Sequence, residues 1–98
     1  MTSHAVNALA AQRIPLETRP LAEVAVGAAA VVRRLALPRA TARRLFEMGL
    51  LPGTLVRVVR RAPLGDPIEL RLRNYSLSIR LEEASHIEVE PSTEVPRR

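Results

Sequence analysis

The side chains that could do chemistry in this chain are few, and most lie near its C-terminal end. Ser85 and His86 are adjacent, but neighbouring residues on a strand point to opposite faces, so they cannot act together as nucleophile and base. His86 also lies close in sequence to four carboxylates, and imidazole with carboxylate can bind iron or zinc. These are Glu82, Glu83, Glu88 and Glu90. A solvated acidic strand end explains the cluster better, so we predict neither a catalytic residue nor a metal site.

The residue types that are missing exclude further chemistry. The 98 residues include no cysteine, and all fifteen basic residues are arginine. Disulfides, thiolate metal sites and cysteine nucleophiles are therefore excluded, as are the lysine of a phosphate-binding loop and Schiff-base chemistry. A single domain of this length also has little room for a deep cofactor cleft. We expect a protein that is not an enzyme, has no cofactor and resides in a reducing compartment.

Positive charge is concentrated in the middle of the chain, although the formal net charge is only +5. Residues 1–32 are neutral, residues 33–80 carry eleven arginines against three acids for a net +8, and residues 81–98 have a net charge of −3. Four arginines fall at outward positions of predicted strands, where they could bind an acidic protein or the anionic headgroups of the inner membrane. They are Arg57, Arg60, Arg71 and Arg73. An ordinary solvated strand surface explains them equally well.

Nucleic acid is the rival partner for a basic surface of this kind. Proteins that bind single strands stack bases on aromatic side chains. The only aromatic residues are Phe46 and Tyr75. We expect Phe46 in the core, which leaves a single ring and argues against nucleic acid.

Alternation of apolar and polar residues predicts a mainly β protein. The expected strands are residues 28–37, 54–61, 68–73, 76–81 and 86–90. One short helix is expected at residues 38–48, with Pro38 at its first helical position, and a single helical turn at residues 81–85. Closing five short strands removes exposed edges. The prediction is therefore a small SH3-like barrel with one short α-helix inserted after the first strand.

Glycine and proline residues predict how the helix ends. Gly49 suits a left-handed residue after the helix, and Leu50 can complete a Schellman motif. Pro52 and Gly53 occupy the central positions of a type II turn. Leu45 and Leu50 are expected in the core, whereas Leu51 and Pro52 are candidates for partner contact. Further along the chain, Asn74 is expected in a tight turn that needs a left-handed residue.

The ordered domain is predicted to cover residues 21–90. Residues 1–20 and 91–98 contain prolines and polar residues without strand alternation, so we expect a flexible N-terminal arm and a flexible C-terminal tail. The longest apolar stretch, residues 21–37, is interrupted by Glu23 and Arg33, which is incompatible with a membrane-spanning helix. The first residues lack the features of a signal peptide. We expect a cytoplasmic protein.

Three groups of residues, in this order, resemble the FeoA family of bacterial ferrous iron uptake. They are RRLFEMGLLPGT at 43–54, APLGDPI at 62–68, and LSIR at 77–80 with Glu83 and Ala84 ahead of Ile87. The resemblance covers residues 21–90, with Asn74 where many members have glycine. It implies an SH3-like accessory protein that docks on the cytosolic face of the membrane transporter FeoB, which carries a guanine-nucleotide-binding domain.

The same module also resembles the C-terminal domain of iron-dependent repressors. The alternative is therefore a nucleic-acid-binding or repressor-associated module, because one fold can serve several functions. The sequence predicts neither the direction of any effect on the transporter, nor self-association, nor a role for the N-terminal arm.

Overall fold

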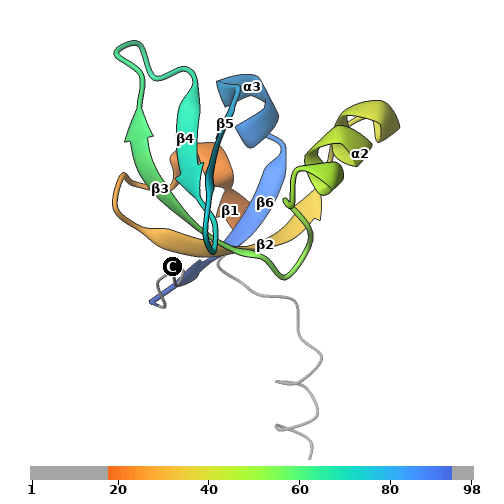
Figure 1. Ribbon diagram of the computed structural model, residues 1–98, viewed down its shortest axis with the longest axis horizontal. Coiled ribbons are helices and arrows are strands. Elements are labelled where there is room, and N and C mark those ends of the chain that lie inside the picture. The colour runs from red at the N-terminus through yellow and green to blue at the C-terminus, as the bar shows by residue number, and fades with distance from the viewer. Residues whose placement is uncertain (1–17, 94–98) are drawn as a thin grey trace, which may run out of the picture.

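Six strands form one antiparallel sheet in the computed structural model, which describes residues 18–93 (Figure 1). In chain order the elements are β1 (Arg19–Pro20), the 3-10 helix η1 (Leu21–Glu23), β2 (Ala29–Leu35), α2 (Arg39–Glu47), β3 (Leu55–Arg61), β4 (Ile68–Arg71), β5 (Ser76–Ile79), α3 (Leu81–Ala84) and β6 (Ile87–Ser92). All five predicted strands are present. In the described residues no helix is long and apolar enough to cross a membrane.

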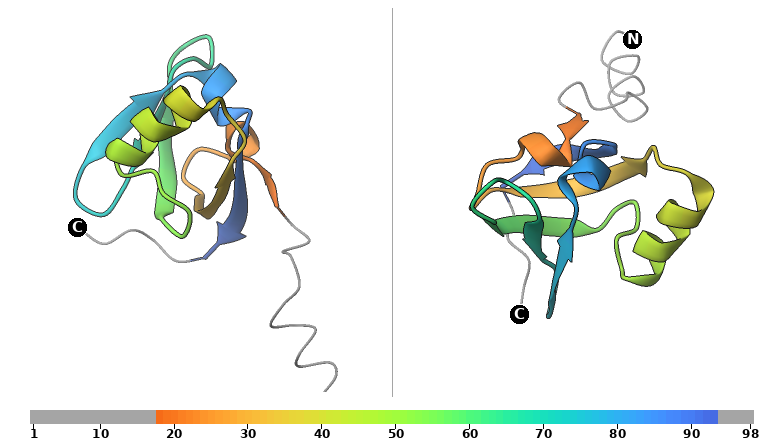
Figure 2. Two further views of the ribbon diagram at one scale, coloured as in Figure 1. Left: turned by 90° about the vertical axis from the view of Figure 1, so that its right-hand side faces the viewer. Right: turned by 90° about the horizontal axis from the view of Figure 1, so that it is seen from above.

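The strands follow the order β1-β6-β2-β3-β4-β5 across the sheet. The sheet curls around its inner face, and α2 lies beside it at one end (Figures 1 and 2). Irregular register in β2, between Val32 and Arg34, and in β3, between Val58 and Arg60, accompanies the curvature, as bulges do in twisted sheets. The mainly β prediction is confirmed. At the two ends of this strand order, β1 and β5 each pair with a single neighbour in the described residues.

The core fills the inner face of the curled sheet. Residues two apart on a strand share a face, and the alternating apolar positions of β2 to β6 point inward. The fully buried large side chains are Leu21, Leu45, Leu50, Ile68, Leu70, Ile87, Val32, Val56, Val58 and Val89. Leu45 and Leu50 are the contributions of α2 and of the residues after it, as expected.

Helix α2 begins one residue later than predicted. Pro38 has an extended backbone, with φ −54° and ψ 149°, and is the N-cap rather than the first helical residue. At the other end, Gly49 has φ +101°. The Leu50 N–H donates to the Leu45 carbonyl and the Gly49 N–H to the Phe46 carbonyl, both at 2.9 Å. These two bonds are a Schellman motif, so the predicted helix end is confirmed.

The predicted type II turn follows immediately. The Thr54 N–H donates to the Leu51 carbonyl at 3.0 Å, and Gly53, at the third position, has φ +95°. The prediction for Asn74 is wrong, because within residues 18–93 only glycines have positive φ. That turn is closed instead by the Leu72 N–H, which donates to the Tyr75 carbonyl at 2.8 Å.

Both ends of the described chain extend beyond residues 21–90. Arg19 and Pro20 pair with Val89 and Glu88 as strand β1, and β6 continues to Ser92. Residues 19–20 and 91–92 are therefore part of the sheet rather than of flexible ends. The remainder of the predicted arm and tail, residues 1–17 and 94–98, lies outside the described residues.

Candidate partner-binding surface

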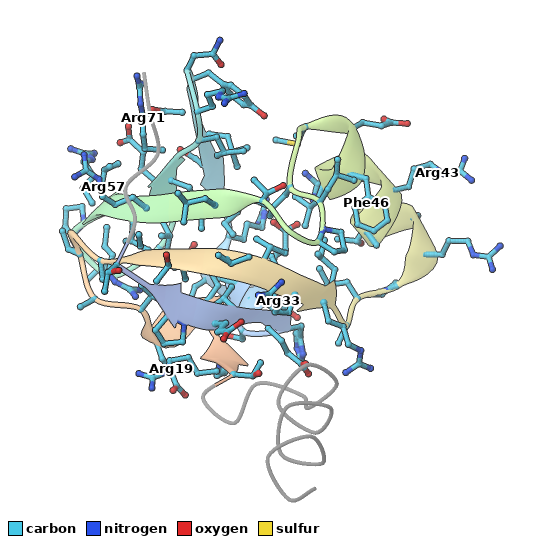
Figure 3. All side chains as sticks on the ribbon, turned by 90° about the horizontal axis from the view of Figure 1, so that it is seen from below. Arg19, Arg33, Arg43, Phe46, Arg57 and Arg71 are labelled. Atoms are coloured by element: carbon cyan, nitrogen blue, oxygen red, sulfur yellow. The ribbon has the colours of Figure 1, made fainter. Side chains whose placement is uncertain are left out.

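The six predicted contact residues fall on two parts of the surface. Leu51 and Pro52 form the turn that follows α2, whereas the four arginines belong to β3, to β4 and to the residues just after β4. Figure 3 shows Arg57 and Arg71 together on one side of the sheet, away from α2. The structure therefore groups the arginines with one another but separates them from Leu51 and Pro52.

Arg57 and Arg71 face each other, and neither has an acidic partner among residues 18–93. They are directly opposed across β3 and β4, an arrangement in which like charges repel. Arg57 is half-buried, and its Nε is enclosed without a hydrogen-bond partner. Arg71 donates from Nη1 to the Oγ of Ser76 at 3.5 Å. Arg73 is exposed, two residues further along. Within the described part of the chain none of these three arginines has an acidic partner, and we call Arg57, Arg71 and Arg73 the arginine cluster.

Arg60 has a different environment from the other three. Its Nε lies 3.3 Å from Oε1 of Glu69, the residue opposite it on β4. The irregular register between Val58 and Arg60 produces this pairing. Arg60 is thus neutralised by an ion pair and does not belong to the arginine cluster.

Several arginines elsewhere on the described surface are paired. Arg33 donates from Nε and Nη2 to Oε1 of Glu90, at 2.9 and 2.7 Å, and Arg34 donates to Glu88 at 3.0 Å. Arg44 of α2 forms an ion pair with Glu83 of α3. Arg61 has a structural role that the sequence did not suggest, since its Nη2 donates to the Ala22 and Val24 carbonyls at 2.5 and 2.9 Å.

The turn after α2 presents apolar side chains to solvent. Leu51 is 46% exposed, and Pro52 is also exposed. The prediction that Phe46 is in the core is wrong, because the residue is 38% exposed. Only one face of the nine-residue helix packs on the sheet, and Leu45 takes the buried position on it. Phe46, the next residue, lies about 100° further around the helix and faces away from the core.

A groove of about 470 Å³ lies between the end of α2 and the start of β5. Phe46 and Met48 line it on the helix side, and Tyr75 and Leu77 line it on the strand side. The Tyr75 hydroxyl donates to the Met48 carbonyl at 2.6 Å and so ties the two sides together. Sequence reasoning missed this groove, although the burial of Leu45 in a short helix was a signal that the adjacent aromatic would be exposed.

Gly49 makes this connection possible in two ways. Its φ of +101° suits glycine, and a Cβ built there would lie 1.9 Å from the Tyr75 hydroxyl oxygen. No other residue fits between the helix end and the tyrosine without displacing one of them.

Three of the four carboxylates near His86 in sequence are already paired with arginines. Glu83, Glu88 and Glu90 are bound by Arg44, Arg34 and Arg33. The Ser85 hydroxyl donates to the Leu81 carbonyl at 2.9 Å. Across residues 18–93, no three side chains of histidine, cysteine, aspartate or glutamate gather where they could hold a metal ion.

The fold is that of a small SH3-like domain, as predicted. A family model described as the FeoA domain matches residues 19–91, and the chain belongs to the FeoA family. A Porphyromonas gingivalis protein described as a fusion of Fe(2+) transport protein A with the Fe(2+) transporter FeoB is 40% identical over 70 residues. The match covers 71% of this chain, which spans only 8% of the length of the fusion protein.

Solved structures show the same relationship. The FeoA protein of Chlorobium tepidum is 40% identical, with a TM-score of 0.71 over 74% of this chain and 69% of that one. FeoA of Stenotrophomonas maltophilia, solved with zinc and described as an SH3 domain protein, is 32% identical, with a TM-score of 0.60 over 72% and 88% of the two chains. A manganese-dependent transcriptional repressor with 19% identity and a TM-score of 0.72 shares the fold alone.

Proposed function

We propose that this chain is a non-enzymatic accessory protein of bacterial ferrous iron uptake, which docks on the cytosolic face of a FeoB-type transporter and modulates its activity. The observation that carries the proposal is the Porphyromonas gingivalis relative, whose description joins a FeoA segment and FeoB in one polypeptide. Fusion holds two partners at a high effective concentration. We therefore expect that a FeoA chain and a FeoB chain that are not fused bind each other. In this proposal the chain acts in the cytoplasm, at the inner face of the membrane.

The apolar turn after α2 is the first contact surface in this proposal. Leu51, Pro52 and Phe46 are exposed within a few residues of one another. Clusters of exposed apolar side chains mark interaction sites, and a few buried anchors supply most of the affinity in such interfaces. The arginine cluster provides a second surface, which favours acidic partners and fast association.

The mode of action follows from binding alone. An accessory protein shifts the conformational equilibrium of its partner only as far as it binds one state more tightly than another. We therefore expect the chain to bind the cytosolic guanine-nucleotide-binding domain with an affinity that depends on the bound nucleotide.

A retention assay with that cytosolic domain tests the proposal. The tagged full-length chain is incubated with the domain in the nucleotide-free state and with GDP or a non-hydrolysable GTP analogue. We expect retention in at least one state, and an affinity about tenfold lower for Leu51→Ser and several-fold lower for Arg57→Ala. Arg34→Ala, which removes an already paired arginine, is the matched control. Absence of retention in every nucleotide state contradicts the proposal.

One observation favours the nucleic-acid alternative, namely the unneutralised pair Arg57 and Arg71. Phosphate contacts make affinity fall steeply with salt. Binding of the chain to duplex DNA is therefore measured from 50 to 200 mM salt. We expect only weak binding. Tight binding with a steep salt dependence would support the nucleic-acid role instead of docking on the transporter.

A further inference from the structure

Strand β5 is an edge of the sheet, and no second strand of the described chain pairs with its outer side. Its single neighbour is β4. In an antiparallel pair, residues that bond to the partner strand alternate with residues whose N–H and C=O groups point away. The bond from the Leu72 N–H to the Tyr75 carbonyl makes Tyr75 a bonded position. Ser76 and Ser78 are then the positions whose backbone groups point outward, and each offers one donor and one acceptor.

Apart from its short length of four residues, this edge lacks the usual protection. Edge strands are commonly blocked by charged side chains, proline or a covering element. The outward side chains of β5 are Ser76 and Ser78, which are small and uncharged, and no strand of the described chain covers them. The edge is therefore open to an added strand, the mode by which extended peptides join exposed sheets.

The outer face beside this edge selects for acidic side chains. Ser76, Arg71 and Arg57 are successive partners across β5, β4 and β3. The Arg71 guanidinium already extends over β5, since its Nη1 lies 3.5 Å from Ser76 Oγ. Glu69, the acid nearest along β4, lies within 4 Å of Arg60. A carboxylate on an added strand, opposite Ser76, would therefore meet an arginine without an acidic partner.

The other face of the edge selects for apolar side chains. Leu77 points to the inner face of the sheet. The groove of about 470 Å³ begins beside it and is lined by Phe46, Met48 and Tyr75. Figure 2 shows α2 and β5 facing each other across this region. Side chains of an added strand that point to the same side as Leu77 enter this groove.

We propose that the free edge of β5 binds an extended segment of a partner protein, in which acidic and apolar residues alternate. The segment adds a seventh strand: its backbone pairs with Ser76 and Ser78, its carboxylates reach Arg71, and its apolar side chains fill the groove. A second copy of β5 fits poorly, because it brings serine rather than carboxylate to the arginine and places two copies of Arg71 near each other. The proposal holds whether or not the segment belongs to the transporter.

Capped hexapeptides test this mode of binding on the full-length chain. The probe alternates glutamate and valine, and the controls alternate lysine and valine or carry N-methyl groups on the pairing amides of the glutamate and valine sequence. Amide NMR spectra report the site and the affinity. We expect the probe to shift the amide signals of Ser76 and Ser78, and both controls to bind at least about tenfold more weakly. Equal binding of either control overturns the proposal.

Substitutions in the protein, rather than in the peptide, test the same contacts. Ser78→Pro removes one outward N–H and leaves the bonds to β4 in place, whereas Ser78→Ala keeps that N–H. We expect about tenfold weaker binding for Ser78→Pro and for Arg71→Ala, and no change for Ser78→Ala or Arg34→Ala.

Unchanged binding to a folded Ser78→Pro variant contradicts strand addition. If that variant unfolds, the N-methylated peptide decides the question on the unaltered protein. A dimer formed through β5, seen by sedimentation, also overturns the proposal.

Discussion

Two halves of the same sheet use arginine in opposite ways. On β2, Arg33 and Arg34 reach across to glutamates of β6. On β3 and β4, Arg57 and Arg71 oppose each other, and no described acid pairs with them. The β6 side of the sheet is also covered by β1, whereas the β5 side ends in a bare edge next to an apolar groove.

In our proposals, this contrast separates the side that completes the fold from the side that binds partners, which we call the recognition side. The pairs on β2 and β6 join residues more than fifty positions apart, yet exposed ion pairs each contribute only about 0–1 kcal/mol. The stability of both sides must therefore come from the common core. Exposure on the β5 side does not imply that this side is loosely held, and substitutions can test this directly.

The largest effect is expected at the anchor of α2 on the recognition side. Leu45 is fully buried, so Leu45→Ala removes buried apolar surface and leaves a cavity. We expect the free energy of unfolding to fall by about 3 kcal/mol, as measured by urea denaturation. A loss of this size shows that the recognition side depends on the same core as the rest of the sheet.

Leu51→Ala is the matched control for this substitution. Leu51 is 46% exposed, so its removal should change the free energy of unfolding by less than about 0.5 kcal/mol. Equal losses for the two leucines would show that Leu51 is a packing residue. They would also weaken its assignment as a partner contact.

A smaller effect is expected at the connection between α2 and β5. In Gly49→Ala the new methyl group takes up a strained φ and displaces the Tyr75 hydroxyl from the Met48 carbonyl. We expect a loss of about 2 kcal/mol in the free energy of unfolding, from the backbone strain and the lost hydrogen bond together. Gly53→Ala shares the positive φ but has nothing within 4 Å, so it should lose only about 1 kcal/mol. Identical losses would mean that Tyr75 does not constrain the helix end.

Much of this architecture could be predicted from sequence because its signals are local. The alternation of Ile68, Leu70 and Leu72 fixes which face of a strand is buried. The positions of Gly49 and Gly53 fix two consecutive turns, since positive φ is strained for other residues.

The features that sequence did not predict depend on contacts between distant residues. Phenylalanine is usually buried, and only the packing of α2 on the sheet shows that Phe46 faces outward. The pairing of Arg19 with Val89 joins the two ends of the domain. Arg60 lies opposite Glu69 only because the register of β3 is irregular. None of these is encoded in a short window of sequence.

The smallest effects test the charge contrast itself. Arg57→Glu converts the opposed arginines into an ion pair, so we expect the free energy of unfolding to rise by about 0.5 kcal/mol. Glu90→Arg replaces the partner of Arg33 with a like charge, and a fall of about 0.5–1 kcal/mol is expected. Both are measured by urea denaturation in 50 mM and 1 M salt, where screening should remove most of each change. If both substitutions destabilise the chain equally and independently of salt, repulsion between Arg57 and Arg71 is not significant, and the two halves do not differ electrostatically.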